Sequence, residues 1–338
     1  MASSLIGKPF NAYRAVDGKL TSTPSTIPSL GPSDVLIRLT HSGVCYTDYE
    51  FFRTGLPLAL GHEGVGIVEA VGSAVSTLKV GDRAGAGFGR RSCGHCRYCL
   101  TGKDIWCYER VTYGWGDFDN GTFSAYYVGD EAHLFKIPDG LASEDAAPLQ
   151  CAGATVYTAL RDTVKPTDRV GIIGIGGLGH LAIRFASKMG TEVVVFSTSR
   201  DKESEARGFG ASEFVLLSEL DKVSKPVDVL VVAGARYPDW SKVLVKEVLA
   251  RAGIIIPLPA PTMGPLVLPA DNLMWEGYNV HSSLVASRVP HTEMLEFAAR
   301  HKIKPTIQLY KFEGAETIKT VFDNLENNKV RYRAVLEF

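Results

Sequence analysis

RVGIIGIGGLGH, residues 169–180, is the segment from which the architecture of this chain is best predicted. A β-patterned run leads directly into Gly174, Gly176, Gly177, Leu178 and Gly179. Glycines at this spacing permit a tight turn, let the backbone approach a pyrophosphate and begin a helix whose N-terminus attracts its charge. A second β-patterned run, TEVVVFST, follows at residues 191–198. Strand, turn, helix and strand in this order predict dinucleotide binding, whereas the glycine spacing alone is often plain turn chemistry.

The patterns of apolar and polar residues on either side of this segment indicate two domains. From about residue 142 onward, apolar runs such as VDVLVVAG alternate with helical patterns such as HLAIRFASKMG, which is typical of a parallel sheet. The preceding residues instead carry short β-patterned runs, among them VLIRLTHSGV (35–44) and GVGIVEAVG (64–72), which indicate a β-barrel. We expect the last run, RYRAVLEF (331–338), to be a strand that returns to this first domain.

The end of TEVVVFST carries information about the cofactor. An NAD enzyme normally keeps a carboxylate there to hold the ribose 2′-hydroxyl. This chain instead has hydroxyl and basic side chains, namely Ser197, Thr198, Ser199, Arg200 and Lys202. Hydroxyls and a guanidinium suit a 2′-phosphate, so the sequence favours NADP(H) over NAD(H). The alternative is that Arg200 and Lys202 are only the solvated start of a helix.

Four of the six cysteines form a tight cluster with metal-ligand spacing, Cys93, Cys96, Cys99 and Cys107. Four thiolates on one short loop can bind one tetrahedral zinc at about 2.3 Å each. A closed set of this kind predicts a structural zinc. Disulfides or idle thiols are the alternative, but six cysteines in 338 residues make a poor disulfide scaffold.

Length and composition are those of a two-domain globular enzyme. The chain has 338 residues, 45% of them hydrophobic, and a formal net charge of −1. Lys and Arg are scattered, so we expect small-molecule partners and no nucleic acid. No apolar run approaches the roughly 18 residues of a membrane span, and the first residues lack a secretory pattern, so we expect a cytoplasmic protein without a membrane partner.

Together these segments resemble the zinc-dependent medium-chain alcohol dehydrogenases, and within them the cinnamyl alcohol dehydrogenase-like branch. The likeness rests on GVCYTD (43–48), GHEGVG (61–66), the four-cysteine loop, KIPDGLASEDAAPLQCAGATVY (136–157), GIGGLGH (174–180) and VRYRAV (330–335). It implies an α/β chain with a GroES-like β-barrel catalytic domain at 1–147 and 289–338 that holds both zinc sites. A doubly wound Rossmann domain at 148–288 is then inserted between these segments, and the protein is expected to form a homodimer.

The resemblance also implies roles for individual residues. Cys45, His62 and Cys151 look like the catalytic zinc ligands, with Glu63 as a carboxylate that can swing onto the metal. Two thiolates and a neutral imidazole leave a fourth position open, where a carbonyl is polarised or an alcohol is deprotonated. Asp48 resembles the acid that orients His62. The remaining matches are Thr47 in the proton shuttle, Glu50 in place of a histidine that often ends it, and Arg333 at the pyrophosphate, where a plain strand-edge arginine is the alternative.

These observations predict a zinc-dependent oxidoreductase that transfers hydride between NADP(H) and an alcohol, aldehyde or ketone. Glu50 keeps a second activity open, the reduction of a conjugated C=C or an iminium C=N bond. A nucleotide-binding protein without turnover is the alternative from another class, but it would have no use for an open metal site. Aromatic side chains in RVTYGWGDFDNGTF (110–123), chiefly Trp115, could line the substrate pocket or simply pack.

Overall fold

The computed structural model describes residues 5–259 and 264–338, and the chain divides into two compact units. Unit 1 is the part up to Ala154 together with Val285–Phe338, and unit 2 is Thr155–Leu284. The boundaries predicted from sequence, 147/148 and 288/289, therefore fall a few residues away. The reason is that the chain stays helical from Ser143 to Arg161, so no turn marks the passage from one unit to the next.

Unit 2 is built on a six-stranded parallel sheet with the strand order β13-β12-β11-β14-β15-β16. Numbered within the unit this is 3-2-1-4-5-6, the order of a Rossmann fold, as predicted. The central strands β11, β12 and β14 are mostly buried and rich in Val and Ile because helices cover the sheet, whereas the edge strand β16 is exposed. Their bounds are β11 (Arg169–Ile173), β12 (Glu192–Ser197), β13 (Glu213–Leu216), β14 (Val227–Val232), β15 (Leu249–Pro257) and β16 (Asn279–Val280).

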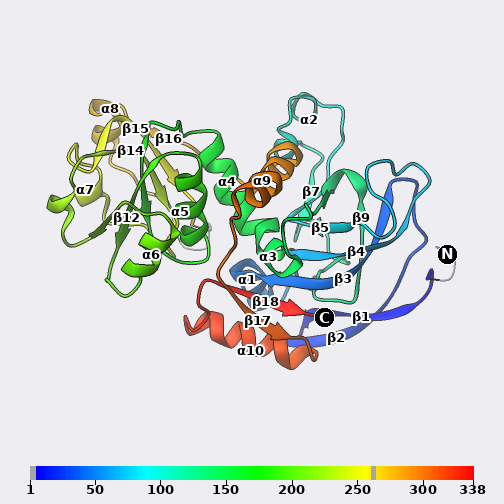
Figure 1. Ribbon diagram of the computed structural model, residues 1–338. Helices are drawn as coiled ribbons and strands as arrows, with labels where there is room; N and C mark the ends of the chain where they lie inside the picture. The colour runs from blue at the N-terminus through cyan, green and yellow to red at the C-terminus, as the bar shows by residue number, and fades with distance from the viewer. Residues whose placement is uncertain (1–4, 260–263) are drawn as a thin grey trace. The chain divides into compact units, whose positions relative to one another are not determined.

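The helices of unit 2 alternate with these strands along the chain (Figure 1). The first of them after the glycine turn is α5 (Gly179–Lys188), whose inner face is fully buried. The others are α4 (Ala154–Arg161), which begins at the unit boundary, α6 (Glu203–Phe209), α7 (Trp240–Val243) and α8 (Ala270–Trp275).

Unit 1 contains a seven-stranded sheet that joins the two ends of the chain. Its order is β10-β5-β4-β3-β18-β17, and β9 also pairs with β3. Figure 1 shows β18, in red, beside β3, in blue, and the pairing is antiparallel from Ala334 opposite Val44 to Glu337 opposite His41. The bounds are β3 (Asp34–Val44), β4 (Gly64–Val71), β5 (Arg83–Ala86), β9 (Tyr126–Asp130), β10 (Leu134–Lys136), β17 (Ile307–Lys311) and β18 (Arg333–Glu337). The predicted return of the last strand to the first domain is thus observed.

Smaller elements complete unit 1. β1 (Pro9–Val16) and β2 (Lys19–Thr26) form a hairpin, and β6 (Gly89–Arg91), β7 (Val111–Tyr113) and β8 (Gly116–Asp117) form a small sheet. The helical elements are α1 (Tyr46–Thr54), α2 (Arg97–Leu100), η2 (Asp104–Trp106), η3 (Glu131–His133), α3 (Ser143–Pro148), η4 (Leu149–Gly153), α9 (Arg288–His301) and α10 (Ala315–Glu326). The elements η2 and η3 are single 3₁₀ turns, and η4 is a short π-helix.

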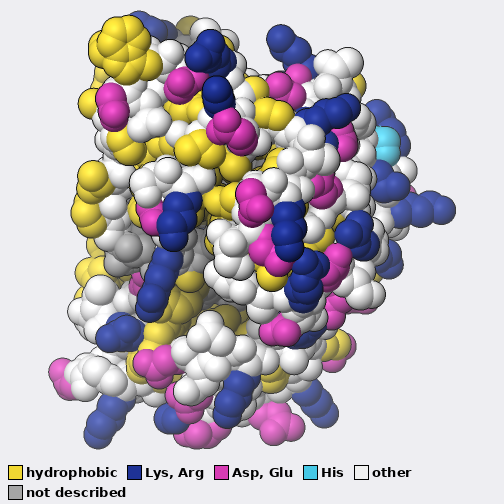
Figure 2. Space-filling model, turned by 90° about the vertical axis from the view of Figure 1, so that its left-hand side faces the viewer, with side chains coloured by type: hydrophobic (Ala, Val, Ile, Leu, Met, Phe, Trp, Pro, Cys, Tyr) yellow, Lys and Arg dark blue, Asp and Glu magenta, His cyan; other side chains and the backbone are white. Residues whose placement is uncertain are grey.

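Charged side chains of both signs lie on the surface. Figure 2 shows basic and acidic side chains interspersed on one face of the molecule, without a field of one sign. This mixture of signs is in keeping with the formal net charge of −1. Among the residues that the structure describes, no helix combines the length and the apolar character needed to cross a bilayer.

Candidate active site and cofactor turn

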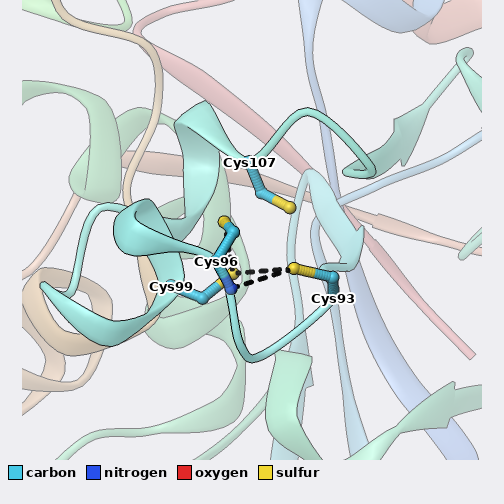
Figure 3. A group of neighbouring side chains, drawn as sticks. All are labelled: Cys93, Cys96, Cys99 and Cys107. Carbon is cyan, nitrogen blue, oxygen red and sulfur yellow. Dashed lines mark hydrogen bonds between the residues drawn. The ribbon is translucent and has the colours of Figure 1, made fainter.

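The four-cysteine loop folds into a compact lobe of unit 1 whose sulfurs converge (Figure 3). Cys96 and Cys99 lie at the start and within α2, and Cys93 and Cys107 lie on the segments before and after it. The Sγ atom of Cys99 is 3.9 Å from that of Cys93 and 3.7 Å from that of Cys96. Four sulfurs about 2.3 Å from a tetrahedral zinc would be about 3.8 Å apart, so the donor set fits zinc. These separations are far too long for disulfides, and all six cysteines are free.

Backbone groups favour the thiolate form in this lobe. The backbone N–H groups of His95 and Cys96 donate hydrogen bonds to the Cys93 sulfur and lower the pKa of that thiol to about 6. A thiolate is the form that binds a metal. Four sulfurs from one loop would fill a tetrahedral coordination shell, which is typical of a structural metal site.

A second cluster of potential metal ligands brings together three parts of unit 1. Cys45 precedes α1, His62 and Glu63 precede β4, and Cys151 lies in η4, and their ligand atoms are all within 4.8 Å of one another. His62 and Glu63 are completely buried. The residues predicted from the resemblance as catalytic zinc ligands are therefore brought together, from positions separated by more than a hundred residues.

Asp48 orients His62. The ring Nδ1 of His62 lies 2.8 Å from Oδ1 of Asp48, which also accepts a hydrogen bond from the backbone N–H of Gly61. The other carboxylate oxygen accepts from the backbone N–H of Cys45 at 2.9 Å. Asp48 stands at the third position of α1 with Cys45 as its N-cap, so the capping geometry of one helix places both groups. This is the role predicted for Asp48.

With Nδ1 bound to a carboxylate, Nε2 of His62 is directed at the sulfurs. This Nε2 atom is buried and has no hydrogen-bond partner among the residues described. A buried nitrogen of this kind is expected at a metal site, where the metal is its partner. Burial lowers the pKa of His62, but the charge and hydrogen bond of Asp48 outweigh it and raise the pKa to about 10. The hydrogen bond from Cys151 lowers the pKa of Cys45 well below its usual range. Neutral imidazole and thiolate are the forms that bind a metal, so a cation at this site would displace the proton from His62.

Tyr113 supports the same histidine, and the sequence did not point to it. Its ring stacks on that of His62 with centroids 4.6 Å apart, and its hydroxyl donates to Oδ1 of Asp48 at 2.8 Å. Tyr113 is fully buried, whereas Trp115, the aromatic residue singled out in the same run, is 73% exposed. The only available signal was the cluster of aromatics in residues 110–123, and spacing alone does not tell which of them turns inward.

Arg333 lies against Glu63. The guanidinium is buried and donates to both carboxylate oxygens of Glu63, from a strand 270 residues further along the chain. Burial raises the pKa of Glu63, and the charge of Arg333 opposes it, leaving the pKa at about 7. An arginine that pairs with the acid beside the metal group is more than a strand-edge residue. Its expected contact with a pyrophosphate stays a prediction.

The two residues predicted to form a proton relay, Thr47 and Glu50, lie on α1. The Oγ1 atom of Thr47 is 3.6 Å from the Cys45 sulfur, so its hydroxyl stands beside the metal group. Glu50 follows three residues later and is half-buried. Residues three apart share a helix face, so Thr47 and Glu50 lie on the same side of α1, and their roles in a proton relay stay predictions.

The glycine turn of unit 2 has the form required to bind a dinucleotide. Gly174, just after β11, has φ +91°, and a Cβ there would lie 2.7 Å from the Gly234 backbone. Around Gly176 the space is open, so a ligand could approach the backbone closely. The turn leads into α5, whose N-terminus begins at Gly179. Gly177 and Leu178 complete it, as predicted.

Groups expected at the 2′-phosphate lie at the end of β12 and the start of α6. Ser197 is the last residue of the strand, and Thr198 and Ser199 follow it. Lys202 donates to the carbonyl of Ile175 at 2.9 Å and so reaches back to the glycine turn. Arg200 pairs with Glu203 and Glu219 while its side chain stays 53% exposed. Exposed pairs of this kind are weak, so a phosphate could compete for Arg200.

Two parts of the chain match models of known protein families. Residues 31–139 match the model of the alcohol dehydrogenase GroES-like domain, and residues 158–253 match that of the NAD-binding domain of D-isomer specific 2-hydroxyacid dehydrogenases. A probable formaldehyde dehydrogenase, AdhA of Bacillus subtilis, is 36% identical, with 91% of each chain covered. The chain belongs to the medium-chain alcohol dehydrogenase family.

Solved structures place this medium-chain alcohol dehydrogenase in the cinnamyl alcohol dehydrogenase-like branch. The cinnamyl alcohol dehydrogenase SbCAD4 of Sorghum bicolor is 30% identical, with 98% of each chain covered and a TM-score of 0.89. The enzyme of the same name from Helicobacter pylori, complexed with NADP(H), is 28% identical, with 97% of this chain and 98% of that chain covered and a TM-score of 0.85. The predicted family and its two-domain fold are thereby confirmed.

Proposed function

We propose that this alcohol dehydrogenase is a zinc-dependent, NADP(H)-dependent enzyme that interconverts alcohols with aldehydes or ketones. The observation that supports it best is that the ligand atoms of Cys45, His62 and Cys151 lie within 4.8 Å of one another, while Nε2 of His62 has no hydrogen-bond partner in the described part of the chain. Zinc held there by these three residues would supply Lewis-acid polarisation of the substrate oxygen. The four-cysteine lobe would hold a second, structural zinc.

The side chains around this point divide the remaining work. In the reductive direction the carbonyl carbon gains hydride from the reduced nicotinamide and the oxygen gains a proton, which the Thr47 hydroxyl donates. Thr47 recovers its proton through Glu50 or water. Asp48 and Tyr113 hold the His62 ring in one tautomer and one plane. Arg333 pairs with the Glu63 carboxylate, and this pairing would have to loosen before Glu63 could serve as a metal ligand.

The test is to assay aldehydes, ketones, enals and imines with NADPH and to identify which bond is reduced. Metal analysis of the same preparation should find two zinc ions per chain. Reduction of aldehydes or ketones to alcohols supports the proposal. Turnover confined to C=C or C=N bonds, which the altered relay at Glu50 keeps open, or a purified protein that contains no metal, would overturn it.

Cofactor preference is a separate prediction. We expect kcat/KM for NADPH to exceed that for NADH by about 10- to 100-fold, because each charged hydrogen bond to the 2′-phosphate contributes about 1.5 to 3 kcal/mol. Arg200→Ala should remove most of this preference by raising KM for NADPH alone. Arg207→Ala is the matched control, since Arg207 is equally exposed on α6 and also pairs with Glu203. A ratio near one in the unmodified enzyme, or equal losses in both variants, contradicts the assignment.

A further inference from the structure

Gln150, the residue before Cys151, is a buried amide with two specific hydrogen bonds. It is completely buried within η4, the five-residue π-helix Leu149–Gly153. Its Nε2 donates to the carbonyl of Ala146 at 3.0 Å. Its Oε1 lies 3.0 Å from Nε2 of His291. A buried amide is costly unless it is paired, so this side chain has one favourable placement.

The space for this amide is provided by glycines of the barrel. A Cβ on Gly85, in β5, would lie 2.5 Å from the Gln150 side chain. A Cβ on Gly87 would lie 2.9 Å from the Gln150 carbonyl and 3.1 Å from the His291 ring. Side chains at either position would force the amide, and the backbone that carries it, to move. Gln150 and His291 are therefore closely packed against the backbone at Gly85 and Gly87.

His291 is a rigid partner for the amide. It lies in the first turn of α9, is buried, and stacks on Phe135 of β10 with centroids 3.6 Å apart and ring planes 5° apart. Burial, and then the neighbouring His133, lower the pKa of His291 to about 3. The ring is therefore neutral and carries one N–H. Because the Gln150 NH₂ group faces Ala146, Oε1 faces His291, and the N–H is at Nε2.

The start of α9 is itself held in place by the four-cysteine lobe. Asp104, which is buried in η2 of the lobe, accepts from the backbone N–H of Arg288 at 3.3 Å. The hydroxyl of Ser287, the N-cap, accepts from the backbone N–H of Ile105 at 3.1 Å. The first turn of α9, which carries His291, is thus bonded to the four-cysteine lobe and also contacts η4.

We propose that Gln150 and His291 form a positioning pair that holds η4 in one register and thereby fixes the Cys151 sulfur as a ligand of the catalytic metal. This inference rests on the proposed function, since it concerns the metal bound by Cys45, His62 and Cys151. π-Helices are rare and usually only one turn long, and they occur frequently at functional sites. Side-chain hydrogen bonds can hold such a short turn in place. Gln150 does not touch the substrate, and its effect passes through the position of Cys151.

The experiment measures metal at the catalytic site directly. Protein loaded with Co²⁺ is mixed with an excess of chelator, and the loss of the cobalt absorption bands is followed over time. The kinetic phase that is missing in Cys151→Ala belongs to the catalytic site. Gln150→Met keeps the length of the side chain but removes both hydrogen bonds, and it should accelerate this phase about 10- to 100-fold, the usual effect of losing a group that supports a ligand. His291→Leu should do the same.

Matched variants separate positioning from general loosening. His291→Gln retains an N–H donor and should keep the catalytic phase near the original rate. In the double variant Gln150→Met/His291→Leu the effect should be no larger than in either single variant, because the two residues act together. Ile318→Ala, a core truncation on the buried face of α10, should lower stability without accelerating the phase. The cobalt bands should shift in Gln150→Met and stay unchanged in Ile318→Ala.

Three results would overturn the inference. If Gln150→Met releases cobalt at the original rate with unchanged bands, the pair does not position Cys151, although the proposed metal site stands. If both kinetic phases accelerate equally, the pair only stabilises the fold. If the unmodified protein has no phase that depends on Cys151, the proposed catalytic metal site fails and the inference fails with it.

Discussion

Cys151→Ala should abolish carbonyl reduction in a protein that still folds and still holds one zinc. The thiolate is one of three proposed ligands of an open site, and a metal that polarises the substrate oxygen supplies several kcal/mol of transition-state stabilisation. A loss of about 4 kcal/mol corresponds to a fall in kcat of about a thousandfold. The measurements are kcat with NADPH and an aldehyde, zinc per chain, and the circular dichroism spectrum.

Cys99→Ser is the contrasting variant. Cys99 is buried in α2, and its sulfur has close neighbours on two sides within the lobe. Because a structural zinc contributes folding free energy, this change should lower stability or assembly more than it lowers the rate per folded molecule. Should both variants simply unfold, the division into a catalytic and a structural site is wrong.

Thr47→Val should lower kcat for aldehydes by about 100- to 10,000-fold, the range for loss of a positioned proton donor. Valine has nearly the shape of threonine, so metal content and cofactor affinity should not change. Thr47→Ser retains the hydroxyl and should keep most of the activity. Glu50→Gln should cause only a modest loss, since water can complete the relay.

The same variant distinguishes between reactions. An iminium or activated alkene gains its hydride at a carbon without needing a proton from Thr47 at an oxygen, so its reduction should be little affected. Full activity of Thr47→Val on every aldehyde tested would contradict the proposed proton path and favour reduction of C=C or C=N bonds.

Local pattern was sufficient to predict the elements that carry each motif. The β-patterned runs at 35–44 and 64–72 are β3 and β4, and the glycine turn lies between β11 and α5, because each is determined by neighbours within a few residues. A third β-patterned run, AYYVGDEAHLFKIP at 125–138, is not one strand in the structure. Asp130 caps a 3₁₀ turn by accepting from the Ala132 N–H, and this turn separates β9 from β10.

Contacts between distant residues could not be predicted from one sequence. Tyr113 reaches Asp48 across 65 positions, and His291 reaches Gln150 across 141. A tyrosine in an aromatic run and a histidine in a helix have many packing solutions, and only the folded barrel selects one. The candidate metal ligands were predicted in spite of similar separations because a recognisable motif surrounds each of them.

The pairing of Glu63 with Arg333 determines when this enzyme can be completed during its synthesis. At about 5 to 20 residues per second, the 270 residues between the two take roughly 14 to 54 seconds to be made. Throughout that interval the nascent barrel has neither its last central strand nor the cation that neutralises its buried acid. Unit 2 is translated entirely within the same interval and can fold first. The proposed metal site, although Cys45 and His62 leave the ribosome early, is therefore expected to be among the last parts of the molecule to mature.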